Sequence, residues 1–312
     1  MEQNRTVVTE IILLGFSRDL TTSTVLFLLF FTVYVITVTG NCLLMLVVLL
    51  TPHLHTPMYF FLFMLSFLDL CNSTSVVPRL LLDIFSISRV ISIGDCTIQL
   101  YTILLMGGTE SLLLTLMAYD RYVAICRPLH YPVLMRWSVC YRLTAIVWIL
   151  SFFIFVFPTL AMPIPLCNPN QINHFMCEIL AITELTCTHL FLSKLLVLCI
   201  CFTSLLLPFV FIIVSYGFII FSVLKIHSAG RSKAFSTCTS HILVVALFFG
   251  TEMILYFGAS AEYSTNQGKY ISVFYAIICP MLNPLIYSLN NKDVKERLKK
   301  LSHFVFIKSN ID

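Results

Sequence analysis

Five ionisable residues lie within long apolar stretches of the sequence or at the ends of these stretches: Asp69, Glu110, Asp120, Arg121 and Glu252. A charged side chain in apolar surroundings is costly unless it is paired, hydrated or neutralised, so each of the five is a candidate functional residue. Asp120 and Arg121 close the third apolar stretch. Their position fits a switch and fits simple anchoring at an aqueous boundary equally well.

Motifs for catalysis or metal binding are missing from the sequence. It holds no C-x-x-C pair, no H-E-x-x-H, no Walker glycine loop and no G-x-S-x-G, which argues weakly against zinc, nucleotide and hydrolase chemistry. Ser240 and His241 are adjacent on a predicted helix and do not face one another, which argues against a nucleophile and base pair. We therefore expect that the protein is not an enzyme and needs no cofactor.

The elements that hold these residues are predicted to be membrane-spanning helices. Hydrophobic residues make up 59% of the chain and charged residues 11%, which does not suit a soluble fold. Seven apolar runs are each long enough to cross a hydrocarbon layer of about 30 Å. Runs this continuous favour helices over barrel strands. We predict an all-α membrane protein, a seven-transmembrane helix bundle with spans Val25–Leu50, Met58–Leu82, Ile98–Ile125, Leu143–Ile164, Phe191–Leu224, Phe235–Ala259 and Tyr270–Leu289.

The distribution of basic residues predicts the orientation. Most of the 19 Lys and Arg residues lie in connections on one side, which the positive-inside rule places in the cytosol. An odd number of spans then puts the amino terminus outside. The net charge of +4 is thus a feature of membrane orientation and gives no reason to propose nucleic acid as a partner. We expect an extracellular segment at 1–24, the bundle at 25–290, and at 291–312 a cytosolic tail with a short amphipathic helix on the membrane surface.

Residues on the predicted outer side could be modified or oxidised. We expect no removable signal peptide, and Asn4 begins a glycosylation sequon. Four of the twelve cysteines fall on the outer side, and their spacing does not choose among three possible pairings: Cys96, Cys167, Cys177 and Cys187. The other eight are expected to be free thiols that pack as small hydrophobic side chains.

Short motifs along the chain resemble those of odorant receptors of the rhodopsin-like G-protein-coupled receptor family, tetrapod-type class. They run in order from Gly40-Asn41 to the carboxyl-terminal region: PMYFFL from Pro57, LSFLDLC from Leu65, MAYDRYVAIC from Met117 followed by RPLHY, Ser215-Tyr216, KAFSTCTSH from Lys233 and PMLNPLIY from Pro280. The chain departs from the usual pattern at a few positions: Met176, Glu178, Asn290 and Phe249, the last of which replaces a commoner tyrosine.

The resemblance implies a plasma membrane receptor. Such a receptor binds small volatile molecules from outside, activates a stimulatory, olfactory-type G protein inside and raises cyclic AMP. The resemblance also implies two disulfides, Cys96 with Cys177 and Cys167 with Cys187. Alignment on Arg121 implies a mostly apolar ligand site lined by Leu104, Gly107, Gly108, Ser111, Ile200, Ser204, Phe249, Glu252, Leu255, Tyr256 and Val273.

Glu252 is the most informative residue of this predicted site, because it lies in the middle of an apolar run, one helical turn before Tyr256. Our hypothesis is that its carboxyl group orients a hydrogen-bond donor or an amine on the odorant. The alternative is an internal partner, such as a hydroxyl group on a neighbouring helix.

Asp69 and Glu110 are predicted to lie at mid-depth, where the family fold would place them near Asn41, Ser111 and Asn283. Two carboxyl groups in one polar pocket can share a sodium ion, which is our preferred interpretation. The alternative is a neutral hydrogen-bonded network in which one of the two is protonated.

The resemblance further implies a two-state switch at the cytosolic end. Asp120 holds Arg121 at rest and releases it on activation, while the inner ends of the last three spans rearrange to admit a G-protein helix. Pro208 and Pro284 are either flexible points or simple packing kinks. The predicted coupling and switch residues are Asp120, Arg121, Tyr122, Tyr216, His241, Pro284 and Tyr287.

Three other functions compete with this prediction. A transporter predicts an internal repeat with paired broken helices, which is not found in the sequence. A receptor of the same architecture that acts outside the nose is closer, and the place of expression would separate the two. An intramembrane enzyme is the weakest alternative, since no catalytic cluster is evident.

Overall fold

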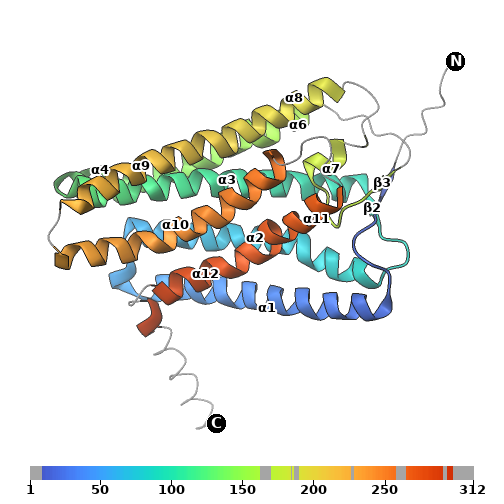
Figure 1. The fold of residues 1–312 in the computed structure, drawn as a ribbon, viewed down its shortest axis with the longest axis horizontal. Coiled ribbons are helices and arrows are strands. Elements are labelled where there is room, and N and C mark those ends of the chain that lie inside the picture. The colour runs from blue at the N-terminus through green and yellow to red at the C-terminus, as the bar shows by residue number, and fades with distance from the viewer. Residues whose placement is uncertain are drawn as a thin grey trace, which may run out of the picture.

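Helices that run side by side build most of the protein in the computed structural model (Figure 1). The structure describes residues 9–161, 170–183, 185, 190–225, 228–257, 265–290 and 294–297. In these ranges, seven helical segments are long and apolar enough to cross a membrane, as predicted. Four of the spans are α1 (Leu20–Leu50), α2 (Pro57–Phe85), α3 (Ile93–Cys126) and, within a longer helix, α10 (Ser228–Phe257).

The three remaining spans each combine two α-helices joined by a π-helical turn. They are α5 (Trp137–Ser151), η3 (Phe152–Val156) and α6 (Phe157–Ala161); α8 (Leu190–Cys201), η4 (Phe202–Leu206) and α9 (Leu207–Leu224); and α11 (Thr265–Val273), η5 (Phe274–Ile278) and α12 (Cys279–Asn290). Short helical turns also occur between spans: η1 (Pro52–Leu54), η2 (Pro128–His130), α4 (Tyr131–Leu134) and α7 (Ile179–Thr183).

Polar caps extend two helices beyond the apolar runs from which they were predicted. The Asp19 carboxylate accepts the backbone N–H of Thr22 at 2.9 Å, so α1 begins at Leu20. The Ser92 hydroxyl accepts the N–H of Asp95 at 3.0 Å, so α3 begins at Ile93. Such capping side chains accept hydrogen bonds from backbone N–H groups that have no partner within the first turn of a helix. Because the capping residues are polar, the lengths of the apolar runs do not reveal these helix starts. The predicted ends of the fourth and sixth spans lie outside the described residues.

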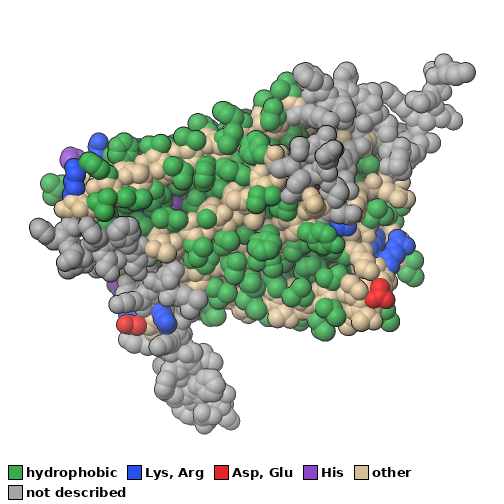
Figure 2. All heavy atoms as spheres, viewed as in Figure 1, with side chains coloured by type: hydrophobic (Ala, Val, Ile, Leu, Met, Phe, Trp, Pro, Cys, Tyr) green, Lys and Arg blue, Asp and Glu red, His purple; other side chains and the backbone are tan. Residues whose placement is uncertain are grey.

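The sides of the bundle are apolar. Figure 2 shows hydrophobic side chains along the length of the molecule, whereas the charged side chains in view lie near its two ends. Many large apolar side chains on α1, α5 and α9 are exposed on this surface. In a soluble protein such a surface would be unstable, but it suits contact with lipid.

Each π-helical turn comes immediately before a proline-containing segment. Pro158, Pro208 and Pro280 each occupy the second position after η3, η4 or η5. Proline has no N–H and its ring clashes with the carbonyl four residues earlier, so the helix must widen or bend there. The positions of the prolines in the sequence therefore predict where these helices are interrupted.

Polar side chains on neighbouring helices bind carbonyl oxygens that prolines leave free. The carbonyl of Ser204, four residues before Pro208, accepts a hydrogen bond from the Ser111 hydroxyl on α3. The carbonyl of Pro280, four residues before Pro284, accepts the side-chain amide of Asn41 on α1 at 2.9 Å. These two bonds join α3 to η4 and α1 to α12. They matter because lipid offers a free carbonyl no hydrogen-bond partner.

A three-stranded sheet, not predicted from the sequence, covers one end of the bundle. Strand β1 (Glu10–Leu13) pairs antiparallel with β2 (Val90–Ser92) and parallel with β3 (Gln171–Ile172). We call this the sheet end and the other end, where α3 finishes, the Arg121 end. In Figure 1 the sheet lies at the right of the bundle, and the Arg121 end, with α4, lies at the left.

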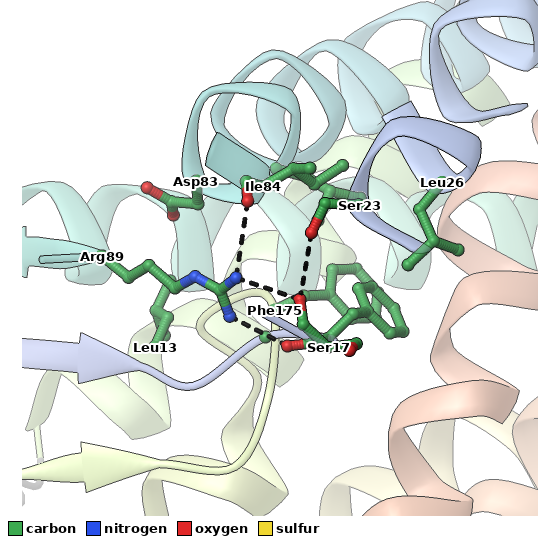
Figure 3. Close-up of a pocket in the computed structure, with 11 residues that line it drawn as sticks. Leu13, Ser17, Ser23, Leu26, Asp83, Ile84, Arg89 and Phe175 are labelled. Carbon is green, nitrogen blue, oxygen red and sulfur yellow. Dashed lines mark hydrogen bonds between the residues drawn. The ribbon is translucent and has the colours of Figure 1, made fainter. Parts of the chain in front are cut away.

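Arg89 fastens the segment after β1 to the sheet end. Arg89 is only 3% exposed, and its guanidinium donates to the carbonyls of Leu14, Phe16 and Ser17. Figure 3 shows the Arg89 side chain pointing toward Ser17 and Ile84. The backbone of Arg89 has a φ of 46°, which is uncommon for a residue with a side chain. Burial lowers the pKa of Arg89, and nearby Arg18 adds to that effect. The carbonyl oxygens surround a gap of only about 10 Å³, so the arrangement is a structural clamp.

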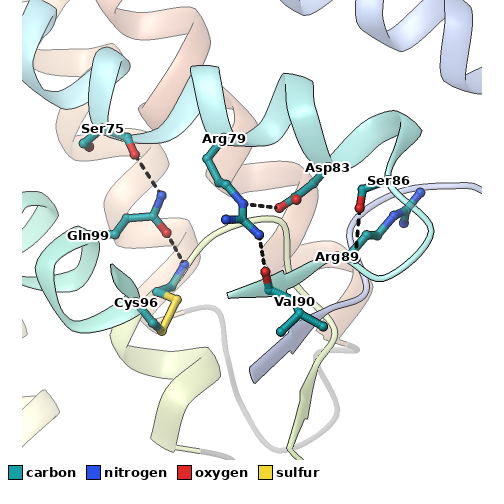
Figure 4. A network of polar contacts seen from close by, with 9 residues as sticks. Ser75, Arg79, Asp83, Ser86, Arg89, Val90, Cys96 and Gln99 are labelled. Carbon is teal, nitrogen blue, oxygen red and sulfur yellow. Dashed lines mark hydrogen bonds and ion pairs between the residues drawn. A yellow bond between two sulfur atoms is a disulfide. The ribbon is translucent and has the colours of Figure 1, made fainter. Parts of the chain in front are cut away.

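The Cys96–Cys177 disulfide, predicted from the resemblance, joins the start of α3 to the loop after β3. Gln99 reinforces this link, because its side chain donates to the Ser75 carbonyl and accepts the N–H of Cys177, both at 2.8 Å (Figure 4). The other predicted pair, Cys167 with Cys187, lies outside the described residues. Eight cysteines in the described part of the chain are free thiols, as expected: Cys42, Cys71, Cys126, Cys140, Cys199, Cys201, Cys238 and Cys279.

Two glycines allow close approach within the bundle. A Cβ on Gly40 would lie 3.2 Å from the ring of Pro284, so glycine lets α1 pack against α12. A Cβ on Gly108 would lie 1.9 Å from the buried ring of Phe155. Gly107, its neighbour, has no such contact, because an added Cβ there meets nothing within 4 Å.

We expect Gly108→Ala to destabilise the protein by about 1–3 kcal/mol, because the methyl group must displace the Phe155 ring. Gly107→Ala is the matched control and should be neutral or slightly stabilising, since alanine favours a helix. Thermal unfolding of the purified protein in detergent measures both. Equal stability of the two variants would contradict the packing described here.

Candidate functional site

A cavity of about 60 Å³ lies between α3, η3, the α8–η4 helix, α10 and η5. Its wall is largely apolar, with a few polar groups, as expected of a small-molecule site. The lining residues are Asn72, Ile103, Leu104, Gly107, Gly108, Glu110, Ser111, Phe155, Ile200, Cys201, Ser204, Leu205, Phe248, Glu252, Tyr256 and Tyr275.

The structure brings eight of the eleven predicted ligand residues to this cavity: Leu104, Gly107, Gly108, Ser111, Ile200, Ser204, Glu252 and Tyr256. The other three lie away from its wall. Phe249 is fully buried against Phe209 and Phe248. Leu255 and Val273 pack instead in an apolar cluster with residues of α1 and α2. The place on the wall that we expected for Phe249 is taken by Phe248, one position earlier.

Several lining residues were not predicted, and two of them carry polar groups. Tyr275 lies in η5, where the π-helical turn changes which side chains face inward. Asn72 lies on α2, and its side-chain oxygen is buried without a hydrogen-bond partner in the structure. The signal for Tyr275 was the proline at 280, which predicts a helical irregularity before it.

Glu252 is partly buried and faces the cavity. Within the described residues its carboxylate forms no hydrogen bond and no ion pair, so the internal hydroxyl partner that we considered is not formed there. Glu110 is the other acidic residue of the wall. The wall contains no Lys, Arg or His.

At the sheet end, a buried polar network connects the loop after β3 to α11. The Ser272 hydroxyl on α11 donates to the Glu178 carboxylate at 3.1 Å, and His174 Nε2 lies 3.2 Å from both of these groups. Lys269, one turn earlier on α11, donates to the Gly15 carbonyl at 2.7 Å and to Asn173 at 3.0 Å. We call this set the lid network, since it ties β1, the β3 loop and α11 together.

Burial sets the protonation of the lid network. Burial, with a smaller contribution from the positive charge of nearby Lys269, lowers the pKa of His174 to about 4. Burial raises the pKa of Glu178 to about 7, against the Ser272 and Tyr256 hydroxyls, which lower it. At neutral pH the imidazole is therefore uncharged, and the contact is a hydrogen bond more than an ion pair.

A second polar cluster lies deeper between α2, α3 and α12. The Asn283 side-chain amide donates to both oxygens of Asp69, at 3.0 and 3.1 Å, and Asp69 is completely buried. Glu110 lies beside this pair and is also buried. Ser111, expected in the same cluster, bonds instead to the Ser204 carbonyl. No group of three or more His, Cys, Asp or Glu residues that could hold a metal ion occurs among the residues searched.

At the Arg121 end, a hydrogen-bonded relay connects three helices. Tyr216 on α9 lies 2.7 Å from His241 Nδ1 on α10, and His241 Nε2 lies 3.1 Å from the Leu114 carbonyl on α3. A carbonyl can only accept, so Nε2 carries the proton and the Tyr216 hydroxyl donates to Nδ1. Both residues were predicted switch residues, and the structure brings them into contact.

The Asp120 carboxylate accepts the Tyr131 hydroxyl at 2.8 Å. The expected pairing with Arg121 is not among the ion pairs formed in the described part of the chain, which are Arg79–Asp83 and His174–Glu178. Arg121 Nε and the Tyr287 hydroxyl are both buried without a hydrogen-bond partner. The reason is geometric, because adjacent residues on a helix point in different directions, whereas α4 brings Tyr131 back over Asp120.

The sequence of this chain is similar to those of known proteins. The family model described as "Olfactory receptor" matches residues 30–303. The chain belongs to the olfactory receptor family. It is 45% identical to Olfactory receptor 2B6 of Mus musculus over 309 residues, which cover 98% of this chain and 99% of that one. It is also 45% identical to Olfactory receptor 8G1 of Homo sapiens over 301 residues, covering 96% and 97% of the two chains.

Membership of this family agrees with the seven spans and the Cys96–Cys177 disulfide. The receptor is a multi-pass plasma membrane protein and not an enzyme. Its family binds odorants and couples to G proteins. Of the predicted tail helix the structure describes only residues 294–297, which are helical. The sequon at Asn4 lies outside the described residues.

We expect the stability of the receptor to depend on pH through Glu178. A folded-state pKa raised to about 7 means that the folded lid binds a proton that the unfolded chain releases at lower pH. The stability this adds is complete below the unfolded pKa and is lost as pH rises through 7. Between pH 6 and pH 8 the loss is about 1.4 kcal/mol relative to Glu178→Gln, which cannot titrate.

Thermal unfolding of wild type and Glu178→Gln at pH 6 and pH 8 measures this difference. His174 is present in both proteins, so its own titration cancels. A stability difference that does not change with pH, or that changes in the opposite direction, would show that Glu178 keeps an ordinary pKa.

Proposed function

We propose that the receptor binds small volatile odorants in the cavity beside Glu252 and activates a stimulatory, olfactory-type G protein, so that cyclic AMP rises. The amino terminus is then extracellular and the carboxyl terminus cytosolic. Family membership and the excess of Lys and Arg in one set of connections support this orientation. The cavity lies toward the sheet end, and the relay lies at the Arg121 end. The buried cluster of Asp69, Glu110 and Asn283, which we call the polar core, lies between these two sites.

The observation that carries the proposal is that α3 takes part in both sites. It supplies Leu104, Gly107 and Gly108 to the cavity wall and, three to four turns further on, Asp120 and Arg121. It contacts α2, α5, α9 and α10. A ligand shifts an equilibrium only by its differential affinity for two arrangements, and α3 is the element through which such a difference can reach the Arg121 end.

In this mechanism Tyr131 and the relay hold the resting arrangement. Asp120 is engaged by Tyr131, and Tyr216 and His241 join α9 and α10 to α3. On activation these bonds are exchanged, Arg121 and Tyr287 gain the partners that they lack here, and a groove opens for a helix of the G protein. Tyr122, whose ring contacts Phe218 on α9, and Pro284 in α12 lie next to the parts that move.

Asp69 and Glu110 form the polar core between the two sites, and we propose that they share a sodium ion with Asn283 as a neighbour. Two buried carboxyl groups side by side favour a cation or a shared proton. The ion would stabilise the resting arrangement if it binds that arrangement more tightly than the active one, as any ligand stabilises the state that it prefers.

A cyclic AMP reporter, screened against a chemically broad odorant panel, tests the proposed function. Arg121→Ala should lose the response at an unchanged level on the cell surface, because it removes the cation that the G-protein groove needs. Arg127→Ala is the matched control, since Arg127 is exposed just beyond the end of α3. An intact response in Arg121→Ala would contradict the mechanism.

Tyr216→Phe tests the relay separately. The change leaves His241 Nδ1 buried without a donor, which costs the resting arrangement about 1–3 kcal/mol. Basal cyclic AMP without odorant should therefore rise. Tyr141→Phe is the control, because Tyr141 is exposed and contacts its neighbours only through its ring. If basal signalling were the same in both variants, the relay would have no part in holding the resting state.

A further inference from the structure

Three carboxyl groups lie at or near the cavity, and two of them are occupied within the protein. Glu178 accepts from Ser272 and contacts His174 in the lid network. Glu110 lies against the Asp69 and Asn283 cluster. Glu252 faces the cavity and forms no hydrogen bond or ion pair within the described residues.

The rest of the wall cannot neutralise Glu252. No basic side chain lines the cavity, and most of the wall is apolar. The Ser111 hydroxyl is already committed to the Ser204 carbonyl. A carboxylate in such surroundings is costly unless a cation arrives, and the interaction with a cation is strong because little water competes. The missing partner is therefore a positive charge with N–H groups to donate.

The dimensions of the cavity limit what can carry that charge. A cavity of this kind needs at least about 10–15 Å³ for each water-sized group, so about 60 Å³ holds roughly four to six such groups. Gly107 adds open space at the wall, since a Cβ there would meet nothing within 4 Å. A short alkyl chain fits beside Leu104 and Ile200, with its polar end directed toward Glu252.

We propose that the receptor is selective for small primary and secondary amines, held as ammonium ions by the Glu252 carboxylate. This inference rests on the proposed function, because it names the class of odorant for the same cavity. An ammonium ion binds a carboxylate directly, and a neutral amine takes the proton of a neutral Glu252, so both routes end in the same ion pair. An alcohol of equal size can donate one hydrogen bond but cannot supply the charge.

The experiment compares n-butylamine with 1-butanol on the purified full-length receptor. Thermal unfolding in detergent measures binding without a G protein, and the cyclic AMP reporter measures signalling. The amine should raise the unfolding temperature at concentrations at least tenfold lower than the alcohol. Glu252→Gln should weaken the amine effect at least tenfold and leave the alcohol effect unchanged, and Glu252→Asp, which keeps the charge, should retain part of the amine effect.

Glu10→Gln is the matched control, because it makes the same substitution at an exposed position on β1. Equal effects of amine and alcohol on the wild type, no effect of the amine, or an amine effect that survives Glu252→Gln would each overturn the inference. An unfolding shift without cyclic AMP would leave amine binding in place and count against the proposed coupling. If only neutral odorants raised cyclic AMP, the proposed function would stand and the inference about amines would be wrong.

Discussion

Carbonyl oxygens inside a membrane must find partners within the protein, and this constraint shapes the receptor more than any other. In three of the seven spans a proline breaks the helical ladder just after a π-helical turn. Ser111 and Asn41 satisfy two of the carbonyls that prolines free, and both come from other helices. The bonds that repair the breaks are thus the bonds that hold the bundle together.

The repairs also determine where the cavity lies. The widened turns η3, η4 and η5 contribute Phe155, Ser204 and Tyr275 to its wall, and α3 passes between them with two glycines. Gly108 lets the Phe155 ring approach the helix backbone, whereas Gly107 leaves space open. An irregular backbone is tolerated at membrane depth only where it is enclosed by protein or lines a cavity, and here it does both.

Buried polar groups divide into those that fix the fold and those left available. Arg89, Gln99 and the lid network use nearly all their hydrogen-bonding groups to join the β1 segment and the β3 loop to the helices. Arg121, Tyr287 and Glu252 have unused groups in the described part of the chain. A buried polar group without a hydrogen-bond partner is costly. We therefore expect Arg121 and Tyr287 to gain partners in another arrangement of the helices, and Glu252 to gain one from a ligand.

The sequence by itself determined the seven spans, the free thiols and half of the residues that line the cavity, because membrane helices are local and their apolar length is read directly. The alignment on Arg121 placed eight of the eleven predicted ligand residues on the wall of the cavity, since a regular helix keeps its register. Only the tertiary structure decided the partners of Asp120 and Ser111, the sheet that joins three distant segments, and the inward turn of Tyr275. Each of these depends on contacts between segments far apart in the chain or on a local widening of the helix, and hydrophobic periodicity contains no information about either.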